Sequence, residues 1–363
     1  MQVLVIGTGQ LSGLMFLAGV SLDIQIMAFD IKSQEIIHPL SKVLLNCNLN
    51  EAVQKADAIT VELENIPDDI LQFFERSGKL SPNIKAIQTG KDRRIEKAFL
   101  DKIKVQNVEY VAINNRIDFD IAIEKIGIPM ILKSTIGGYD GKNQWRLTNT
   151  KNINAIWQEL EKCITTSVKQ GIIAEKLIPF TRELSIVGAR AKNGTIVTYT
   201  LSENIHNNGI LILSTTIKNF ELQRKADKIF STIVDKLKYV GILAVEFFDV
   251  NGRLLVNEIA PRVHNSGHWT QEGAETSQFE NHLRAICDMS LGSTKLTQMT
   301  SMINILGRDF VPNEILAIKD CYIHWYQKKK RVGRKMGHIN ICAKSTSELE
   351  QKVSLLNKAL NKR

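Results

Sequence analysis

The stretch that decides the fold is residues 246–270, EFFDVNGRLLVNEIAPRVHNSGHWT. It contains two apolar runs that carry one glutamate each, Glu246 and Glu258, and an Asn-Gly pair lies between the runs. Asn-Gly between alternating apolar residues is a strong signal for a β-hairpin. We therefore expect two antiparallel strands with one carboxylate on each.

The length of the hairpin loop decides what the carboxylates can do, because a shift of one residue moves a side chain to the other face. A two-residue loop, Asn251-Gly252, would place Glu246 and Glu258 on opposite faces. A three-residue loop that ends with Gly252 in the left-handed conformation would place them on one face, and we predict this loop. The two acids with Asn257 would then suit Mg²⁺ bridging nucleotide phosphates. A half-exposed strand with solvated acids is the alternative.

The residues after Glu258 favour the metal site over that alternative. A non-repetitive loop directly beyond the strand carries cationic, imidazole and amide side chains, namely Arg262, His264, Asn265 and His268. Loops on rigid scaffolds are where binding and catalytic groups gather. We therefore expect an anion site beside the two carboxylates.

Composition bounds the class of protein. The chain has 363 residues, 44% of them hydrophobic and 23% charged, which indicates two or three soluble globular units. Its 47 Lys+Arg against 38 Asp+Glu favour polyanionic ligands such as nucleotides or nucleic acid. Against nucleic acid, aromatic residues are only 6% of the chain, and no basic stripe is interleaved with stacking residues.

The cysteines and the amino terminus indicate the compartment. Five cysteines without CxxC spacing suggest neither a disulfide framework nor a zinc site, and a reducing cytoplasm is the simplest setting. The chain starts directly on an apolar strand, and no apolar run approaches about 20 residues, so we expect neither export nor membrane spanning.

The amino-terminal segment predicts a βαβ unit, with the glycine turn Gly7-Thr8-Gly9-Gln10-Leu11 between strand and helix. A dinucleotide site is one interpretation, but Ser12 stands where the third glycine of that fingerprint belongs. The backbone amides of the turn could still hold a phosphate or another polar ligand at the helix start. Glu62 follows a later strand of the unit and is a candidate for a ligand's hydroxyl or amine, with a solvated loop acid as the alternative.

Two segments in the middle of the chain suggest a nucleotide site. Lys133 ends a short strand and precedes the glycine-rich run Gly137-Gly138-Tyr139-Asp140-Gly141, for which we favour a flap over phosphates rather than a plain glycine hairpin. Residues 171–179 form a strand that runs into a hinge, whose backbone could bond an adenine edge. Glu183 could then accept hydrogen bonds from ribose hydroxyls.

The carboxyl-terminal part, from about residue 296, is predicted to be a small β-rich unit with a basic turn at residues 328–335. A charge run is usually a solvated turn. If the turn instead folds over the cleft, Lys328, Arg331 and Arg334 would clamp a phosphate monoester.

Taken together, four motifs resemble the N5-carboxyaminoimidazole ribonucleotide synthases, which are ATP-grasp carboxylases of purine synthesis. They are Gly7-Thr8-Gly9-Gln10-Leu11, the flap run, residues 257–271 and Gly333-Arg334-Lys335-Met336-Gly337-His338. The resemblance covers nearly the whole chain, and the run from Asn257 is its most specific part. It implies an α/β and α+β architecture, the ATP-grasp fold, with a Rossmann-like domain over residues 1–90, a grasp domain over 91–295 and a small β domain over 296–363.

The resemblance also implies the reaction and its residues. ATP, bicarbonate and 5-aminoimidazole ribonucleotide would give the N5-carbamate, ADP and phosphate in a cytoplasmic homodimer. Matched positions imply Mg²⁺ on Glu246 and Glu258, and catalytic roles for Arg262, His264 and Asn265. The ATP residues would be Arg93, Lys133, Gly138, Tyr139, Asp140, Gly141, Glu175, Lys176, Leu177, Ile178, Glu183, His206, Asn257 and Glu258. The substrate residues would be Gln10, Leu11, Glu62, Tyr139, Asp140, Arg262, Lys328, Arg331 and Arg334.

Some positions depart from the family pattern. Ser12 and Gly13 replace Gly-Arg and remove a cation from the substrate end, while Asn143 replaces a glycine and Val332 a proline. These changes bear on substrate affinity rather than on reaction type. A formate-using ribonucleotide transformylase of the same fold is the nearest alternative, and a basic nucleic-acid-binding protein is the distant one.

Overall fold

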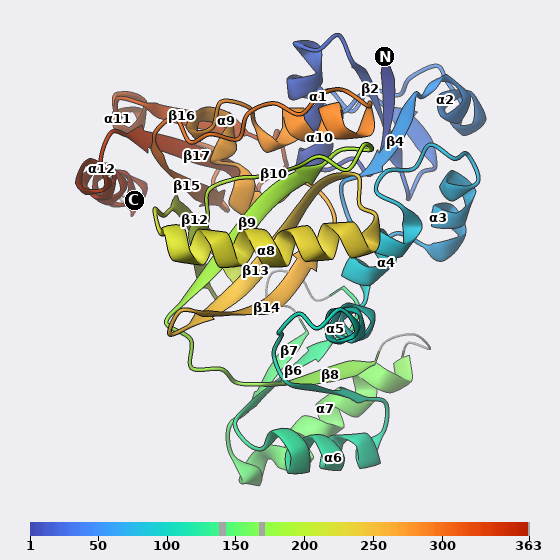
Figure 1. Ribbon diagram of the computed structural model, residues 1–363, viewed down its shortest axis with the longest axis vertical. Helices are drawn as coiled ribbons and strands as arrows, with labels where there is room; N and C mark the ends of the chain where they lie inside the picture. The colour runs from blue at the N-terminus through green and yellow to red at the C-terminus, as the bar shows by residue number, and fades with distance from the viewer. Residues whose placement is uncertain (138–142, 167–170, 362–363) are drawn as a thin grey trace.

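The computed structural model of the chain describes residues 1–137, 143–166 and 171–361. In this part of the chain the strands form three sheets. Figure 1 shows the amino-terminal unit above, a long twisted sheet through the middle, and a small lobe below. Among the described residues, no helix has both the length and the apolar character needed to cross a bilayer.

The amino-terminal unit is a four-stranded sheet of order β3-β2-β1-β4 with helices around it. Strand β1 is parallel to β2 and β4, so the predicted βαβ opening is confirmed, while β3 is antiparallel to β2. Its elements are β1 (Gln2–Ile6), α1 (Gln10–Val20), β2 (Gln25–Asp30), β3 (Glu35–Ile37), α2 (Leu49–Lys55), β4 (Ala58–Val61), α3 (Asp68–Glu75) and α4 (Ile84–Lys91). Ligands of such sheets bind beyond the carboxyl ends of the strands, where Gly7 and Glu62 lie.

The small lobe is a four-stranded antiparallel sheet of order β5-β8-β6-β7, packed on two helices. Helix α5 (Arg93–Lys102) leads into the lobe from the unit above (Figure 1). The other elements are β5 (Tyr110–Ile113), α6 (Arg116–Ile126), β6 (Met130–Ser134), β7 (Gln144–Leu147), the 3-10 turn η1 (Thr150–Asn152), α7 (Ile153–Thr166) and β8 (Ile172–Lys176).

The large sheet has nine strands in the described part of the chain, in the order β14-β13-β9-β11-β12-β15-β17-β16, and β10 also pairs with β9. Its strands are β9 (Arg182–Arg190), β10 (Ile196–Thr198), β11 (Ser202–Asn207), β12 (Ile210–Thr216), β13 (Gly241–Val250), β14 (Arg253–Ala260), β15 (Met299–Leu306), β16 (Cys321–Trp325) and β17 (Lys335–Ala343). Strand β12 pairs with β15, so the carboxyl-terminal strands extend the central sheet. The domain limits expected from the sequence stay a prediction.

Helices cover this sheet because their apolar residues recur at helical spacing. Helix α8 (Phe220–Leu237) buries Leu222, Ala226, Phe230, Ile233, Val234 and Leu237. It begins at Asn219, whose side chain accepts from the Leu222 N–H, and ends at Lys238 in the left-handed conformation. The remaining elements are the 3-10 turn η2 (Asn265–Gly267), α9 (Thr270–Gly273), α10 (Gln278–Ile286), α11 (Asn313–Leu316) and α12 (Thr346–Asn361).

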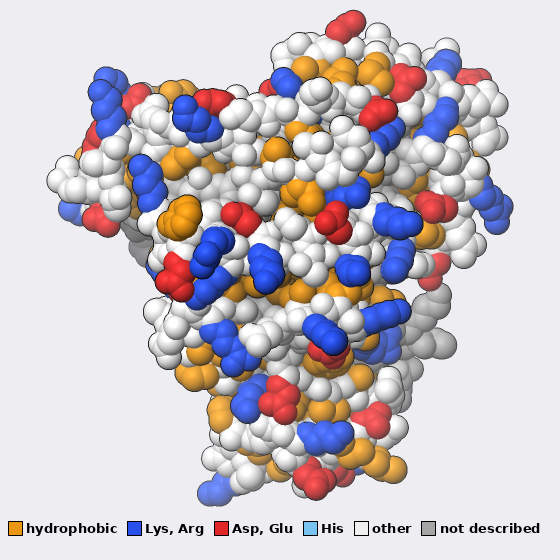
Figure 2. Space-filling model, viewed as in Figure 1, with side chains coloured by type: hydrophobic (Ala, Val, Ile, Leu, Met, Phe, Trp, Pro, Cys, Tyr) orange, Lys and Arg blue, Asp and Glu red, His pale blue; other side chains and the backbone are white. Residues whose placement is uncertain are grey.

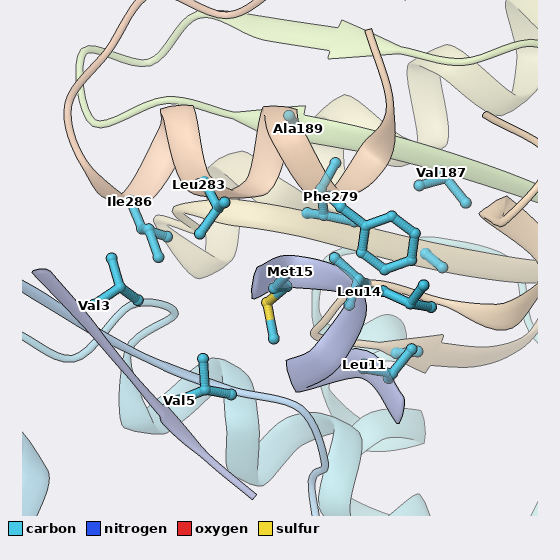
Figure 3. Packing of buried hydrophobic residues seen from close by; sticks show 14 of the residues in the cluster. Val3, Val5, Leu11, Leu14, Met15, Val187, Ala189, Phe279, Leu283 and Ile286 are labelled. Carbon is cyan, nitrogen blue, oxygen red and sulfur yellow. The ribbon is translucent and has the colours of Figure 1, made fainter. Parts of the chain in front are cut away.

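One hydrophobic cluster joins the amino-terminal unit to the large sheet. Figure 3 shows Leu14 and Met15 of α1 between Val3 and Val5 of β1 on one side and α10 on the other. Phe279 of α10 is 1% exposed, and burying such a side chain stabilises the fold by roughly 1.5–3 kcal/mol. One face of the first sheet is therefore held, through α1, against α10 and the large sheet, which matters because site residues come from both units.

A buried histidine, His282 of α10, bonds both units. The backbone N–H of Ile242 donates to its Nδ1 (3.0 Å), so Nε2 carries the proton and donates to Thr60 Oγ1 (2.8 Å). Burial lowers the pKa of His282 to about 4. The neutral ring is therefore the form that this interface requires.

We expect this histidine to make the fold sensitive to acid. The folded pKa lies below the unfolded value, so its contribution is complete above the unfolded pKa and is lost as the pH falls from about 6.5 towards 4. The free energy of unfolding is measured with urea at pH 7.5 and at pH 5. Between these two pH values it should fall by about 2 kcal/mol more in the wild type than in His282→Gln. Other buried histidines titrate equally in both proteins, so equal losses would contradict the assignment.

Candidate active site

The hairpin of β13 and β14 brings the two glutamates together, but not by the predicted turn. Val250 pairs with Arg253, so the loop has two residues, Asn251 and Gly252, with φ values of 53° and 82°. Left-handed conformations at both positions are typical of the tight hairpin turn that Asn-Gly favours. The prediction of a three-residue loop is therefore wrong.

A β-bulge corrects the register that the short turn would otherwise impose. The pairing shifts between Glu246 and Phe247, where Asn257 is inserted into β14, and Glu246 then lies directly opposite Glu258. Directly paired residues of an antiparallel ladder share a face. The predicted juxtaposition of the acids is confirmed, although its cause is the bulge rather than the loop.

An imidazole and a guanidinium lie beside the pair. His264 Nε2 lies 3.7 Å from Glu246 Oε1, and Arg93 Nη2 lies 3.4 Å from Glu258 Oε2. Burial and the negative charge of Glu258 raise the pKa of Glu246 to about 7, although His206 lowers it. The site thus holds a buried acid that a cation would stabilise in its ionised form.

Two facing carboxylates fit a magnesium ion only in part. Among the described residues, no group of three or more His, Cys, Asp and Glu side chains is arranged to hold a metal by itself. Mg²⁺ commonly takes one or two carboxylates and completes its shell with water and substrate phosphates. Glu246 and Glu258 therefore fit an ion that arrives with a nucleotide.

Glu183 and His206 form a second pair on the neighbouring strands. His206 Nδ1 lies 2.7 Å from Glu183 Oε2. Burial alone would lower the pKa of His206, but Glu183 and Glu246 outweigh it and raise the pKa. The large sheet thus gathers three acids and an imidazole close to the hairpin.

Lys133, Glu175 and Arg93 connect the small lobe to this site. Lys133 Nζ on β6 donates to Glu175 Oε2 on β8 (2.6 Å), and Arg93 bonds the carbonyl of Ser134 (3.3 Å). Burial would raise the pKa of Glu175, but the neighbouring lysines hold it at about 2. A charged Glu175 therefore orients Lys133 at the mouth between lobe and sheet.

The hinge after Glu175 is held by backbone bonds. The N–H of Lys176 donates to the carbonyl of Glu109 (3.0 Å), and that of Leu177 to the carbonyl of Pro129 (3.4 Å). Ile178 accepts from the N–H of Phe180 (3.0 Å). The predicted adenine contacts of this segment stay a prediction, and the predicted flap residues Gly138, Tyr139, Asp140 and Gly141 lie outside the described residues.

The glycine turn before α1 is occupied by a carboxylate of the protein itself. Glu62 accepts hydrogen bonds from the N–H groups of Gly9 and Ser12, the latter at 2.8 Å. A side chain at Gly7, whose φ is 115°, would collide with Glu62. The expectation that these amides could hold a phosphate or another polar ligand stays a prediction, and a ligand at the Gly9 and Ser12 N–H groups would have to displace Glu62.

Residues of the first and last units meet beside this glycine turn. Lys328 Nζ donates to Gln10 Oε1 and lies 5.2 Å from the centre of the Tyr326 ring. Burial lowers the pKa of Lys328 to about 8. The Leu11 side chain is buried in the shared core, so only its backbone could face a ligand. Lys328 and Gln10 are thus in contact although 318 residues separate them.

The other two residues of the predicted clamp lie differently. Arg334 Nη1 donates to the carbonyl of Lys329 (2.9 Å), and the Arg331 side chain is exposed. Lys335, which the sequence reasoning did not select, acts electrostatically on Glu246, His206 and His264. Lys328 of the basic turn therefore contacts the glycine turn, and the charge of Lys335 acts on the hairpin.

The loop beyond β14 lies beside the carboxylates as predicted. Arg262 Nε lies 2.8 Å from Glu64 Oε1, and His264 Nδ1 is 2.9 Å from Ser266 Oγ. Burial and the charge of Arg262 hold the pKa of His264 well below its usual value, so this ring is neutral. Asn265 Nδ2 is buried and has no hydrogen-bond partner in the described part of the chain. A buried amide donor without a partner is a position where a ligand would bind.

Sequence reasoning missed Glu64, Glu96 and Lys97 as well as Lys335. Glu96 and Lys97 follow Arg93 at the three- and four-residue spacing of one helix face, which was the available signal. Glu64 lies in the segment that also holds Glu62, and no pattern indicated that Arg262 would pair with it.

Three family models match the chain in succession. Residues 1–91 match the ribonucleotide synthetase preATP-grasp domain, and residues 98–279 match the ATP-grasp domain. Residues 300–352 match the phosphoribosylaminoimidazole carboxylase C-terminal domain. The fold implied by the sequence resemblance is confirmed.

Individual relatives span the full chain. The N5-carboxyaminoimidazole ribonucleotide synthase of Vibrio parahaemolyticus is 55% identical over 361 residues, which are 99% of this chain and 96% of the relative. The crystal structure of N5-carboxyaminoimidazole ribonucleotide synthetase from Thermus thermophilus has a TM-score of 0.87 and 32% identity, with 99% of each chain covered. N5-carboxyaminoimidazole synthase from Aspergillus clavatus, in complex with ADP and 5-aminoimidazole ribonucleotide, has a TM-score of 0.87 and 25% identity, with 99% of this chain and 98% of that chain covered.

Proposed function

The chain belongs to the N5-carboxyaminoimidazole ribonucleotide synthase family of ATP-grasp ligases, and from this premise we propose how its residues carry out the reaction. The activity is the ATP-dependent carboxylation of 5-aminoimidazole ribonucleotide in purine biosynthesis. The observation that carries the proposal is the pairing of Glu246 with Glu258 beside Arg262 and His264. The proposed carboxyl donor is bicarbonate.

We propose that Glu246 and Glu258 hold Mg²⁺ together with the phosphates of ATP. When bound, the ion would neutralise phosphate charge and fix the nucleotide for transfer. Lys133 and Arg93 reach the same mouth from the small lobe and α5, and they would bind phosphate oxygens. Phosphoryl transfer depends mainly on such positioning and charge neutralisation.

The nucleoside part of ATP would lie towards the hinge. The backbone of Lys176, Leu177 and Ile178 borders the small lobe, and Glu183 with His206 borders the hairpin. A carboxylate bonded to a histidine is a suitable acceptor for ribose hydroxyls. The buried Glu175 acts in this proposal by orienting Lys133 rather than by touching the base.

Bicarbonate is a poor electrophile until it is phosphorylated, so the proposed intermediate is carboxyphosphate. Arg262 would neutralise its developing charge, since its partly buried guanidinium lies beside Glu64 and acts on Glu258. His264 accepts from the Ser266 N–H at Nδ1, so its protonated Nε2 would help to position the anion, and the amide of Asn265 can donate to a carboxylate oxygen. These three groups come from one loop, so they would act on one small anion. The phosphate released from carboxyphosphate would take the proton of the attacking amine.

The aminoimidazole ribonucleotide would lie between the glycine turn and the basic turn. Gln10 and Glu62 offer polar atoms at the carboxyl edge of the first sheet, and Lys328 reaches them from the last unit. Arg334 and Arg331 lie on the same basic turn and would bind the phosphate monoester. The amine would thereby point towards the loop that holds Arg262.

The assembly and the compartment are further proposals. A homodimer is proposed from the family resemblance alone. A reducing cytoplasm is supported by the free thiols of Cys47, Cys287, Cys321 and Cys342. On the face viewed in Figure 2, Lys and Arg side chains are interspersed with Asp and Glu, and pairs such as Lys225 with Glu221 (2.7 Å) reduce the net field.

The test is an ADP-release assay in which each substrate is omitted in turn. We expect full turnover only with ATP, Mg²⁺, bicarbonate and 5-aminoimidazole ribonucleotide together, and at least about a tenfold loss on omission of any one. Replacement of bicarbonate by formate is the control for transformylase activity. ADP release that needs formate, or that ignores the ribonucleotide, would overturn the proposal.

A further inference from the structure

Helix α5 carries two ionisable side chains that the proposed chemistry does not use, and burial raises the pKa of Glu96 to about 8. Glu96 is 1% exposed and Lys97 is 0% exposed. Removing an ion from water costs several kcal/mol unless partners replace the lost hydration. The positions of the hydrogen-bond partners therefore indicate what these two buried side chains hold in place.

The partners lie on both sides of Glu258. Strand β14 is an edge strand of the large sheet, and its ladder is interrupted by the inserted Asn257. Lys97 Nζ donates to the carbonyl of Asn257 (2.8 Å), and the N–H of Ile259 donates to Glu96 Oε1. Helix α5 thus fixes the backbone immediately before and after the proposed metal ligand.

Lys97 also reaches the small lobe. Its Nζ lies 3.4 Å from Glu175 Oε1, and Glu175 Oε2 accepts from Lys133 (2.6 Å). A single ammonium therefore joins the bulge of β14 to strand β8, and through Glu175 to the lysine proposed for phosphate binding. No other side chain in the described part of the chain is shown to bond both the Asn257 carbonyl and Glu175.

We propose that Lys97 is a positioning residue, whose buried ammonium sets the separation between the metal ligand Glu258 and the phosphate-binding Lys133. The inference rests on the proposed function, since it assumes that MgATP binds between these two groups. It assigns Lys97 no contact with the substrates. Loss of the ammonium should weaken nucleotide binding and slow turnover but leave the cleft at Gln10 and Glu62 unchanged.

The experiment compares Lys97→Met, Lys97→Arg and the control Lys102→Met, which removes an exposed lysine from the same helix. Binding of a non-hydrolysable ATP analogue with Mg²⁺ is measured by calorimetry, and kcat and each KM are measured by ADP release. For Lys97→Met we expect the analogue Kd to rise about tenfold and kcat to fall about tenfold or more, with the KM for aminoimidazole ribonucleotide within about twofold. Lys97→Arg should recover part of both losses, and Lys102→Met should match the wild type.

The outcomes separate positioning from a purely structural role. A lower melting temperature in Lys97→Met with an unchanged analogue Kd would overturn the proposal. An equal rise in the analogue Kd, the KM for ATP and the KM for aminoimidazole ribonucleotide would also overturn it. If Lys97→Met does not fold, Lys97→Arg decides, because the longer, planar guanidinium keeps the charge but changes the spacing between the two acceptors. An analogue Kd within about 1.5-fold of wild type in that variant would overturn the proposal. Analogue binding needs no second substrate, so it remains interpretable even if the wild type fails the omission assay.

Discussion

Replacing Glu258 by glutamine is expected to reduce ADP release by at least about a thousandfold, which corresponds to roughly 4 kcal/mol of lost transition-state stabilisation. The carboxamide has nearly the same shape, but it removes one of two negative charges that would hold Mg²⁺ against the phosphates. Glu258 is 42% exposed at its side chain, so the fold should tolerate the change. Turnover is measured with all substrates present over a series of Mg²⁺ concentrations.

Glu203→Gln is the matched control. Glu203 is 37% exposed and lies 3.2 Å from Arg182, much as Glu258 lies 3.4 Å from Arg93. Glu203 precedes Asn204 on β11, and successive side chains of a strand point to opposite faces. The Glu203 side chain therefore lies on the face opposite that of Asn204 and His206. We expect Glu203→Gln to retain turnover within about twofold. If Glu258→Gln behaved like this control, the metal site would have to lie elsewhere.

The second large effect is expected at Arg262. Arg262→Met should lower kcat about 100- to 1,000-fold, because one preorganised charge facing a developing anion contributes roughly this much. The same change leaves Glu64 without its partner at 2.8 Å, so the free energy of unfolding should fall by about 3 kcal/mol. ADP release and urea unfolding measure the two effects separately.

A double variant distinguishes these effects. Glu64→Gln in the Arg262→Met background removes the unpaired charge, so we expect most of the lost unfolding free energy to return while kcat stays low. Recovery of turnover in the double variant would show that Arg262 acts only by pairing with Glu64. Glu64→Gln alone is the reference for the stability comparison.

The hairpin shows which features of the site sequence patterns can predict. The Asn-Gly turn and the apolar alternation identified both strands, and the acids were rightly expected to share a face. The predicted cause, a three-residue loop, was wrong, because a bulge at Asn257 sets the register and no turn signal in the sequence indicates that bulge. The bulge is bonded by what lies beside the strand, here the buried side chains of Glu96 and Lys97 on α5.

Long-range partners account for the other differences. The glycine turn at Gly9 was recognised as an anion-binding shape, but the anion is Glu62, which is 53 residues away. Similarly, Lys335 acts on Glu246 only because the last strands continue the central sheet. Local pattern finds strand ends, helix starts and charged turns, whereas the choice among several possible partners is made by packing between units.

The pairing of β12 with β15 has a consequence for any attempt to shorten this chain. Strands β15, β17 and β16 are bonded in series onto β12, so a truncation before Met299 would uncover β12 at Leu213, Ser214 and Thr215. An uncovered strand offers its amide and carbonyl groups to any other chain, and self-association commonly follows. The last sixth of the protein therefore also protects the ligase from aggregation, and it cannot be treated as a detachable module.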